Sequence, residues 1–517
     1  EATSNLMTVA VGQFDPGRVG GPNATQGLEG HSFVNPWDFV LMIEGALLLA
    51  GSVVRRMGTR QRDKAVFPFT VKPSSVGYGS TSEADVAAAR GEIWLPLWNA
   101  FASPQELRQV FSEGRAEVLG QQSRDGVDFA RAVAGLGVDR GIASFIRFGF
   151  LKRSGKAYLA APLSRFEVRE HREVDLLQEV HRWKDNLRLA CSRDAAPPRF
   201  SAALRRIDSA IFDFCRYGGN LRMAEILCAL GNAERELAVG GRFREEYRLN
   251  PVPPFSSAWI SACDDGSAEF RLALALASIG GDHNGQVGDL RTNLEPVERK
   301  GFRWIWTEKN RAVVWSSADL CRNLTAILAR RLIDASRAGL DQLPLAGRFA
   351  VSLNDVSRFL AQETDDHRLE ELLWGLLLIG DTKNWRDQME QLTKPPQRPL
   401  LLPSAYSLLK LLFLPRKLSW PTGTEGVIVK SEPEILGRLR AGDVNGACQI
   451  AARRLRASGF IPMPGPMSGG RRREIKFDPH VDATRLAAAL LFPVSETLKL
   501  ARLVLRSQTE EPTEIAI

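Results

Sequence analysis

Apolar residues recur at helical spacing through most of the second half of the chain. The segment 364–379 carries five leucines on one face, at positions Leu369, Leu372, Leu373, Leu376 and Leu377. This i, i+3, i+4, i+7 spacing is typical of an amphipathic helix. Asp365 and Asp366 fall in its first turn, where the helix dipole favours acidic side chains.

The same pattern predicts further helices towards the C-terminus. One runs over 443–458 and stops at Gly459, and two more cover 481–492 and 495–506, separated by Pro493. Together they predict a C-terminal helical bundle. Residues 167–250 are also predicted to be helical, and the Pro-rich segment 251–254 ends this run as a plausible linker.

The first 165 residues are rich in glycine and mixed in type. An apolar stretch over 39–54, preceded by Pro36, has 16 residues and contains Glu44. A membrane span needs about 20 apolar residues, so we interpret this stretch as a buried core helix. Ser103 and Glu106 have capping-box spacing and predict a helix start.

Alternating and aromatic segments predict a minor β component. A strand is expected over 92–98, and a hairpin over 148–160 turning at Ser154-Gly155. A second β element is expected over 301–315, with its tryptophans on either side of a polar turn at 308–311.

The chain has 517 residues, which is too many for one hydrophobic core. We therefore predict a multidomain fold that is mainly α with minor β, with a mixed α/β N-terminal part and a C-terminal helical bundle. The predicted segments are a Gly-rich mixed α/β domain over 1–165, a helical segment over 166–254, a mixed segment with a β hairpin over 255–350, and a C-terminal helical bundle with a basic loop over 351–517.

Composition places few limits on function. Hydrophobic residues make up 44% and charged residues 25%, which are ordinary globular values. Six cysteines lack C-x-x-C spacing and have no histidine at a ligand interval, so neither zinc nor a disulfide framework is expected and a reducing cytoplasm is the simpler prediction. No signal peptide is found, and the chain opens at Glu1 without a methionine, which suggests a fragment.

Positive charge is concentrated in one segment. The formal net charge is +8, and residues 436–476 alone carry nine basic and two acidic residues, which gives +7. A stretch rich in Pro and Gly over 461–470 leads directly into Arg471, Arg472 and Arg473. Guanidinium groups pair bidentately with phosphate oxygens, so this segment is a candidate for nucleic-acid binding. A solvated face with a flexible connector is the alternative.

No specific catalytic constellation is found. The chain contains no nucleotide-binding phosphate loop, no H-E-x-x-H and no G-x-S-x-G. His283, in the polar stretch 282–285, is a candidate nuclease residue, but a turn is favoured, and His31 is weighed in the same way. The acidic pairs 264–265 and 365–366 could in principle hold magnesium, although a surface turn and a helix start explain them. We expect no catalytic site, no metal and no cofactor.

A string of unusual motifs adds a family resemblance. In the N-terminal part they are GQFDPG at 12–17, GGPNATQG at 20–27, NPWDFVL at 35–41, FPFTV at 67–71, GEIWLPLW at 91–98, DGVDFA at 125–130 and GVDRGI at 137–142. Near the C-terminus they are AARRLRASG at 451–459 and LAAALLFP at 486–493. The chain resembles the large-subunit signature protein of CRISPR type I-G systems, formerly I-U. Members of this family carry a further N-terminal region, which the sequence from Glu1 does not include.

The resemblance implies a role in an RNA-guided surveillance complex. Such large subunits help to recognise the flanking motif on duplex DNA and stabilise the displaced strand during R-loop formation. The implied partners are other subunits of the complex, guide RNA, target double-stranded DNA with its displaced strand, and a recruited helicase-nuclease. No enzymatic activity, no membrane and a cytoplasmic location are expected.

The candidate nucleic-acid-binding residues come from the residue types and not from the family. Candidates for phosphate contacts are Arg453, Arg454, Arg456, Arg471, Arg472 and Arg473. Candidates for base edges are Asn23, Gln26 and Asn35, for which hydrogen bonds within the loop are the alternative. Lys152 and Arg153, at the hairpin, are further candidates.

Two other function classes remain open at this point. The chain could be a stand-alone metal-dependent nuclease that uses His283 or an acidic pair. It could also be a purely structural scaffold subunit, held by protein contacts through its apolar helices.

Overall fold

The computed structural model describes residues 7–10, 30–51, 54–55, 65–66, 69–73, 76, 91–99, 101–112, 117–118, 121–136, 141–153, 157–193, 196–282, 285–380, 388, 390, 392–393, 400–420, 425–463 and 481–506. Within these ranges the fold is mainly helical, with a small antiparallel sheet region near the N-terminus and a helical C-terminal part. This confirms the predicted fold class.

The chain divides into two compact units. Unit 1 comprises residues 1–181 and 204–226, and unit 2 comprises residues 182–203 and 227–517. The organisation into four segments stays a prediction.

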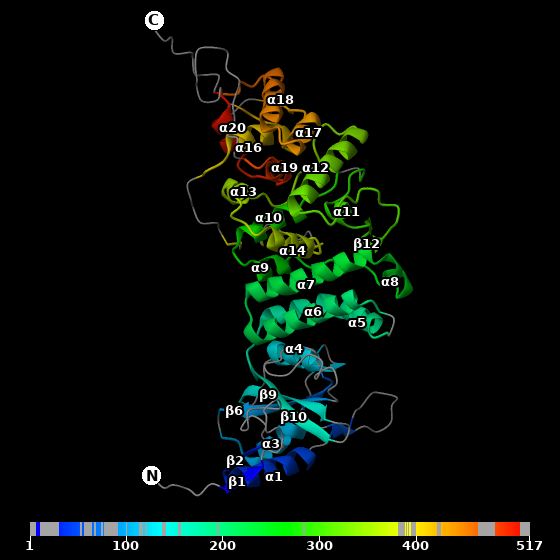
Figure 1. Ribbon diagram of the computed structural model, residues 1–517, viewed down its shortest axis with the longest axis vertical. Helices are drawn as coiled ribbons and strands as arrows, with labels where there is room; N and C mark the ends of the chain where they lie inside the picture. The colour runs from blue at the N-terminus through cyan, green and yellow to red at the C-terminus, as the bar shows by residue number, and fades with distance from the viewer. Residues whose placement is uncertain are drawn as a thin grey trace. The chain divides into compact units, whose positions relative to one another are not determined.

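Unit 1 is built on a four-stranded antiparallel sheet with strand order β10-β9-β6-β5 (Figure 1). The sheet strands are β5 (Thr70–Val71), β6 (Glu92–Trp98), β9 (Ile142–Arg153) and β10 (Ala157–Glu167). The short strand pairs are β1 (Met7–Ala10) with β2 (His31–Val34), β3 (Val54–Arg55) with β4 (Ala65–Val66), and β7 (Glu117–Val118) with β8 (Gln121–Gln122). The helices that begin in this unit are α1 (Pro36–Gly51), α3 (Pro104–Ser112), α4 (Gly126–Leu136), η3 (Arg172–Leu177) and α5 (Gln178–Cys191).

The sheet confirms the predicted strand at 92–98 and the predicted hairpin. Arg153 of β9 pairs with Ala157 of β10, while the turn between them lies outside the described residues. Trp94 of β6 is fully buried, with its ring centroid 4.5 Å from that of Phe129 and 5.2 Å from that of Phe166. An aromatic cluster therefore forms the core against this sheet.

Helix α1 corrects one prediction. The apolar stretch was expected to be a buried core helix, and it does form a helix, but Trp37, Leu41 and Leu47 are 69%, 67% and 69% exposed. Its apolar residues lie around the whole circumference and not along one stripe, so no single packing face can cover them. The prediction of burial was wrong because the length and apolar character of a segment do not show which neighbours its helix has.

The predicted start of α3 is confirmed by a reciprocal capping box. The backbone nitrogen of Ser103 donates to Oε2 of Glu106 at 2.6 Å, and the backbone nitrogen of Glu106 donates to Oγ of Ser103 at 3.3 Å. The backbone hydrogen bond from Ser103, with the side-chain bond next, lowers the pKa of the Glu106 carboxyl.

Helices α6 and α7 lead from unit 1 into unit 2, and the elements that follow them belong to unit 2. The helices up to the centre of the chain are α6 (Pro198–Tyr217), α7 (Asn220–Val239), α8 (Gly241–Glu246), α9 (Ala258–Cys263), α10 (Ala268–Ala277) and α11 (Arg291–Leu294). The later ones are α12 (Leu320–Arg337), α13 (Leu353–Leu360), α14 (Asp366–Leu376), α16 (Ser404–Lys410), η4 (Leu411–Phe413), α17 (Glu434–Arg440), α18 (Val444–Ala457), α19 (Ala483–Ala489) and α20 (Thr497–Val504). The strands are β11 (Val297–Lys300) and β12 (Arg303–Trp306).

Helix α14 confirms the predicted apolar face. All five predicted leucines are buried, and Asp365 caps the helix by accepting from the backbone nitrogens of His367 and Arg368. The helix also passes very close to α7. A Cβ atom at Gly231 would lie 2.5 Å from the backbone nitrogen of Gly375, so glycine permits this crossing.

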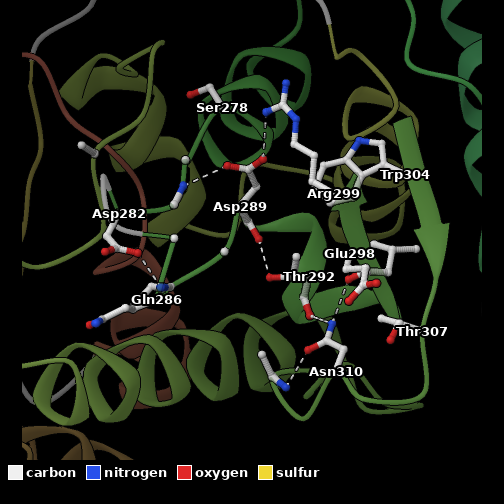
Figure 2. A pocket seen from close by; sticks show the side chains of 18 of the residues that line it. Ser278, Asp282, Gln286, Asp289, Thr292, Glu298, Arg299, Trp304, Thr307 and Asn310 are labelled. Atoms are coloured by element: carbon white, nitrogen blue, oxygen red, sulfur yellow. Dashed lines mark hydrogen bonds and ion pairs between the residues drawn. The ribbon is translucent and has the colours of Figure 1, made fainter. Parts of the chain in front are cut away.

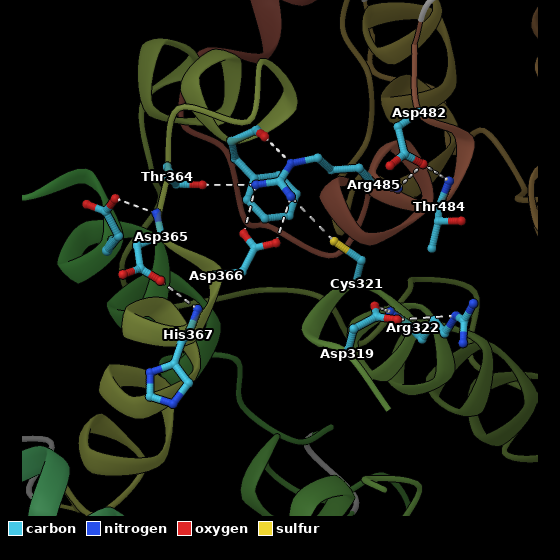
Figure 3. A network of polar contacts seen from close by, with 12 residues as sticks. Asp319, Cys321, Arg322, Thr364, Asp365, Asp366, His367, Asp482, Thr484 and Arg485 are labelled. Carbon is cyan, nitrogen blue, oxygen red and sulfur yellow. Dashed lines mark hydrogen bonds and ion pairs between the residues drawn. The ribbon is translucent and has the colours of Figure 1, made fainter. Parts of the chain in front are cut away.

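One arginine joins α14 to the C-terminal helices. Arg485 of α19 donates to both carboxylate oxygens of Asp366, at 2.7 and 2.8 Å, and to Oγ1 of Thr364 at 3.1 Å (Figure 3). Its guanidinium carbon also lies 4.1 Å from the ring centroid of Phe359. This network fixes α19 against α13 and α14.

The predicted C-terminal bundle is confirmed by α16 to α20, which pack on one another (Figure 1). Lys410, at the end of α16, is buried inside it. Its Nζ donates to the carbonyl of Leu490 at 2.6 Å and to that of Phe413 at 3.4 Å. Burial lowers the pKa of Lys410 to about 7.

Two details of the central region correct the predictions. The β11–β12 hairpin turns at Gly301, which has a φ of 65°, and the predicted polar turn at 308–311 follows the second strand instead of joining two strands. The segment 251–254 is not a loose linker, because Val252 is fully buried and its nitrogen donates to Oε2 of Glu234 at 2.9 Å. The turn at Gly301 is local and was placed too late in the chain, whereas the burial of Val252 depends on a distant residue that local sequence does not show.

Among the described residues, no helix combines the length and the apolar character that crossing a membrane requires.

Candidate nucleic-acid interface

Helix α18 presents two of the predicted arginines on its outer side. Asp443 caps the helix by accepting from the backbone nitrogen of Gly446 at 2.8 Å. The inner side buries Ala451 and Leu455 in the bundle, while Arg453 and Arg456 are exposed. Since these arginines are three positions apart, they are neighbours on the helix surface. They form an outward-facing positive pair on a well-packed helix.

Arg454 has different surroundings from the other two. Its side chain is partly buried, and its Nε lies 3.6 Å from Oε1 of Glu432, so an intramolecular carboxylate offsets its charge. Arg438 of α17 is similarly occupied, with ion pairs to Glu434 at 3.0 Å and Asp443 at 3.2 Å. The hydrogen bond with Glu434 is the largest cause of the raised pKa of Arg438.

Arg440, at the end of α17, was not among the predicted site residues, although it lies in the basic segment. Its side chain is exposed, and α17 packs against α18. It is the last residue of α17, directly before Ala441 and Gly442, and a basic residue followed by a glycine stop is the signal that could have identified it. We name Arg453 and Arg456 the α18 arginine pair.

The other described candidates lie in unit 1. Asn35 precedes α1, and its Oδ1 accepts from the backbone nitrogen of Trp37 at 3.1 Å, which is the local hydrogen bonding considered as the alternative to base contact. Lys152 and Arg153 end strand β9, where they pair with Tyr158 and Ala157 of β10.

Several predicted residues lie outside the described residues. They are Asn23, Gln26, Arg471, Arg472 and Arg473. The structure therefore brings together the three arginines of α18 and leaves these five residues as predictions.

The acidic pairs are engaged in hydrogen bonds and ion pairs within the chain. Oδ1 of Asp265 accepts from the backbone nitrogen of Ser267 at 3.0 Å, and its Oδ2 lies 3.2 Å from Arg368. Asp365 caps α14, and Asp366 holds the arginine of α19. Within the part of the chain that the structure describes, no cluster of three or more His, Cys, Asp or Glu side chains is arranged to hold a metal ion.

Asp282 and Gly285 stand on either side of residues 283–284, which lie outside the described residues, and the backbone nitrogen of Gly285 donates to the carbonyl of Asp282 at 3.2 Å. Asp282 donates from its backbone nitrogen to the carbonyl of Val287 at 2.9 Å, and its Oδ1 accepts from the nitrogen of Val287 at 2.5 Å. His283 lies outside the described residues, and His31 is exposed on β2. The turn that was favoured over a nuclease site at His283 therefore stays a prediction.

Sequence reasoning missed the tip of the β11–β12 hairpin. Phe302 is 90% exposed there, between the exposed side chains of Lys300 and Arg303. The signal was the succession Lys300-Gly301-Phe302-Arg303, a glycine turn with an aromatic residue between two cations. The expected hairpin was placed too late in the chain for this tip to be recognised.

No model of a known protein family matches the chain, and no curated protein matches it.

Proposed function

We propose that this chain is the large subunit of an RNA-guided CRISPR surveillance complex of type I-G. In this role it helps to recognise the flanking motif on duplex DNA and stabilises the displaced strand during R-loop formation. It performs no catalysis itself. Its partners are the other subunits, guide RNA, the target DNA with its displaced strand, and a recruited helicase-nuclease.

The observation that carries the proposal is the exposed arginine pair of α18. Arg453 and Arg456 project from a helix whose opposite side is fixed in the bundle, and the described residues show no ion pair to either. Exposed guanidinium groups on a rigid support suit phosphate contacts, because little conformational entropy is lost on binding. The basic segment that follows α18 in the sequence adds Arg471, Arg472 and Arg473 to this charge.

Helix α1 supports the idea that the chain is one subunit of an assembly. Its exposed apolar side chains include Trp37, Leu41, Ile43 and Leu47. A contiguous exposed apolar surface is typical of a region that another protein covers. We assign this surface to contact with a neighbouring subunit.

A cytoplasmic location completes the proposal. All six cysteines are free, and five of them are buried. Free thiols suit a reducing compartment, which is where a DNA-targeting complex acts.

The test measures binding of the complete complex, assembled with guide RNA, to duplex target DNA at several salt concentrations. The variant carries Arg453→Ala and Arg456→Ala. Each lost phosphate contact lowers the salt dependence of log affinity by roughly 0.9. Two lost contacts should therefore lower it by about 2 and weaken target binding, while the complex still assembles.

A matched control removes the same charge elsewhere. Arg322→Ala with Arg337→Ala takes two exposed arginines from α12 and should leave the salt dependence unchanged. If both double variants weaken DNA binding to the same extent, the effect is one of net charge and the α18 arginine pair is not at the interface. If neither changes DNA affinity although assembly is intact, a purely structural scaffold becomes the better explanation.

A further inference from the structure

The β11–β12 hairpin combines an exposed aromatic ring with exposed cations. Phe302 is 90% exposed at the turn, and the side chains of Arg299, Lys300 and Arg303 are exposed on the strands beside it. An aromatic ring among cations is the combination with which proteins hold single-stranded nucleic acid, because the ring stacks on a base and the cations contact phosphates.

A cavity of about 770 Å³ lies at the foot of this hairpin. Figure 2 shows Arg299 and Trp304 on one side of it and Asp282 and Gln286 on the opposite side, with Asp289 between them. Arg299 and Trp304 also line a small hollow, and Phe302 is a further residue of its lining. The cavity and the hairpin tip are therefore continuous parts of one surface.

The charges inside the cavity are balanced. Arg299, Lys309 and Arg348 are offset by three carboxylates, and one of these, Asp289, accepts from the backbone nitrogen of Gly281 at 2.9 Å and lies 3.8 Å from Nη1 of Arg299. A balanced interior does not favour a phosphate. It suits a flat, neutral group that carries both donors and acceptors, and nucleobases have this chemistry.

The walls of the cavity are held in place from behind by buried groups. Arg331 is fully buried and donates to the carbonyls of Gly280 at 2.6 Å and Gly288 at 3.0 Å, and both glycines line the cavity. Nδ2 of Asn310 donates to the carbonyl of Thr292 at 2.9 Å on the other side. A site fixed in this way loses little entropy when a ligand binds.

We propose that the hairpin and the cavity form a binding site for an unpaired strand of nucleic acid. One base enters the cavity beside Trp304, the next base stacks on Phe302, and Lys300 and Arg303 contact the phosphates between and beyond them. Because a paired base cannot leave its stack without cost, the site selects single strands over duplex. The inference rests on the proposed function, and it identifies which form of the nucleic acid unit 2 contacts.

The test measures binding of the full chain to a dye-labelled single-stranded DNA of 12 nucleotides by fluorescence anisotropy. Phe302→Ala should weaken binding about 5- to 150-fold, the range expected for the loss of one base–aromatic stack. Phe302→Trp keeps an aromatic face and should restore binding. Gln286→Trp narrows the cavity without changing the hairpin and should also weaken binding.

Phe101→Ala is the matched control, because it removes an equally exposed phenylalanine of unit 1 and should change nothing. Unchanged affinity in both Phe302→Ala and Gln286→Trp would overturn the inference while leaving the proposed function in place. The inference would also fall if wild type bound no single strand, or if a free mononucleotide competed as well as the oligonucleotide. If Phe302→Ala weakens single-strand binding but the α18 double variant leaves duplex binding unchanged, the inference stands and the proposed function loses its main support.

Discussion

Replacing Lys410 with methionine should change how the stability of the C-terminal helices depends on pH. Nζ of Lys410 is enclosed in the bundle and donates to two backbone carbonyls, and the described residues place no carboxylate beside it. Burial lowers its pKa from 10.5 to about 7. At about 1.4 kcal/mol for each pKa unit, this difference corresponds to about 5 kcal/mol.

The direction of the pH dependence follows from how many protons Lys410 binds in the folded and in the unfolded chain. Between pH 7 and 10.5 the unfolded chain holds a proton on Lys410 that the folded chain has lost, so the free energy of unfolding rises with pH in this window. The rise is at most about 1.4 kcal/mol per pH unit. Below pH 7 the lysine is protonated in both states, and it makes no further change.

Hydrogen exchange of the α16 and α19 amides, followed by mass spectrometry at pH 7, 8 and 9, measures this effect locally. The quantity of interest is the opening free energy of Lys410→Met minus that of wild type at the same pH. Methionine has no charge to desolvate, so this difference should be largest at pH 7 and fall by up to about 3 kcal/mol by pH 9. The two hydrogen bonds that Lys410→Met removes change this difference by the same amount at every pH.

Lys499→Met provides the control, because this lysine is 64% exposed on α20 and should give a difference that does not vary with pH. A constant difference for Lys410→Met over the same range would refute the reasoning. It would mean that the ammonium group keeps an ordinary pKa and that water reaches it.

Two further substitutions test the packing of unit 2, both by chemical denaturation. Arg271 contacts the buried carboxylate of Asp355 at 2.8 and 3.0 Å, and Arg271→Ala leaves that carboxylate without its cationic partner. This change should lower the free energy of unfolding by about 3–5 kcal/mol. The control Arg438→Ala breaks an exposed pair and should have no measurable effect. Gly231→Ala forces α7 and α14 apart and should lower the free energy of unfolding by about 1–3 kcal/mol. The control Gly437→Ala has open space around it in α17 and should raise that free energy by about 0.5–1 kcal/mol. A Gly231→Ala variant more stable than the Gly437→Ala variant would contradict the close crossing.

Local patterns predicted the helices of unit 2 well, because capping and apolar periodicity act within one or two turns. The apolar face of α14, the cap at Asp443 and the stop at Gly459, where φ is 87°, all follow from residues within four positions of one another. The hydrogen bonds of Arg485 reach across 119 residues to Asp366, and no local pattern contains such a pair.

The candidate interface was predicted only in part, for the same reason. The sequence places Arg453, Arg454 and Arg456 in one helix, but the ion pair with Glu432, 22 positions earlier, separates Arg454 from the other two. The exposure of α1 was missed because burial depends on neighbours elsewhere in the chain. The cavity beside Trp304 likewise depends on Arg331, whose partners come from two separate segments, 280–293 and Pro344.

The crossing of α7 and α14 has a consequence for how this protein can change over evolutionary time. At Gly231 and Gly375 each backbone occupies the space that a side chain on the other helix would need. A larger residue at one position cannot be offset by a smaller one at its partner, because nothing is smaller than glycine. Diverged relatives with this arrangement should therefore keep both glycines, separated by a similar length of chain, after most surface motifs have been lost. The pair offers a way to recognise distant members when overall similarity has faded.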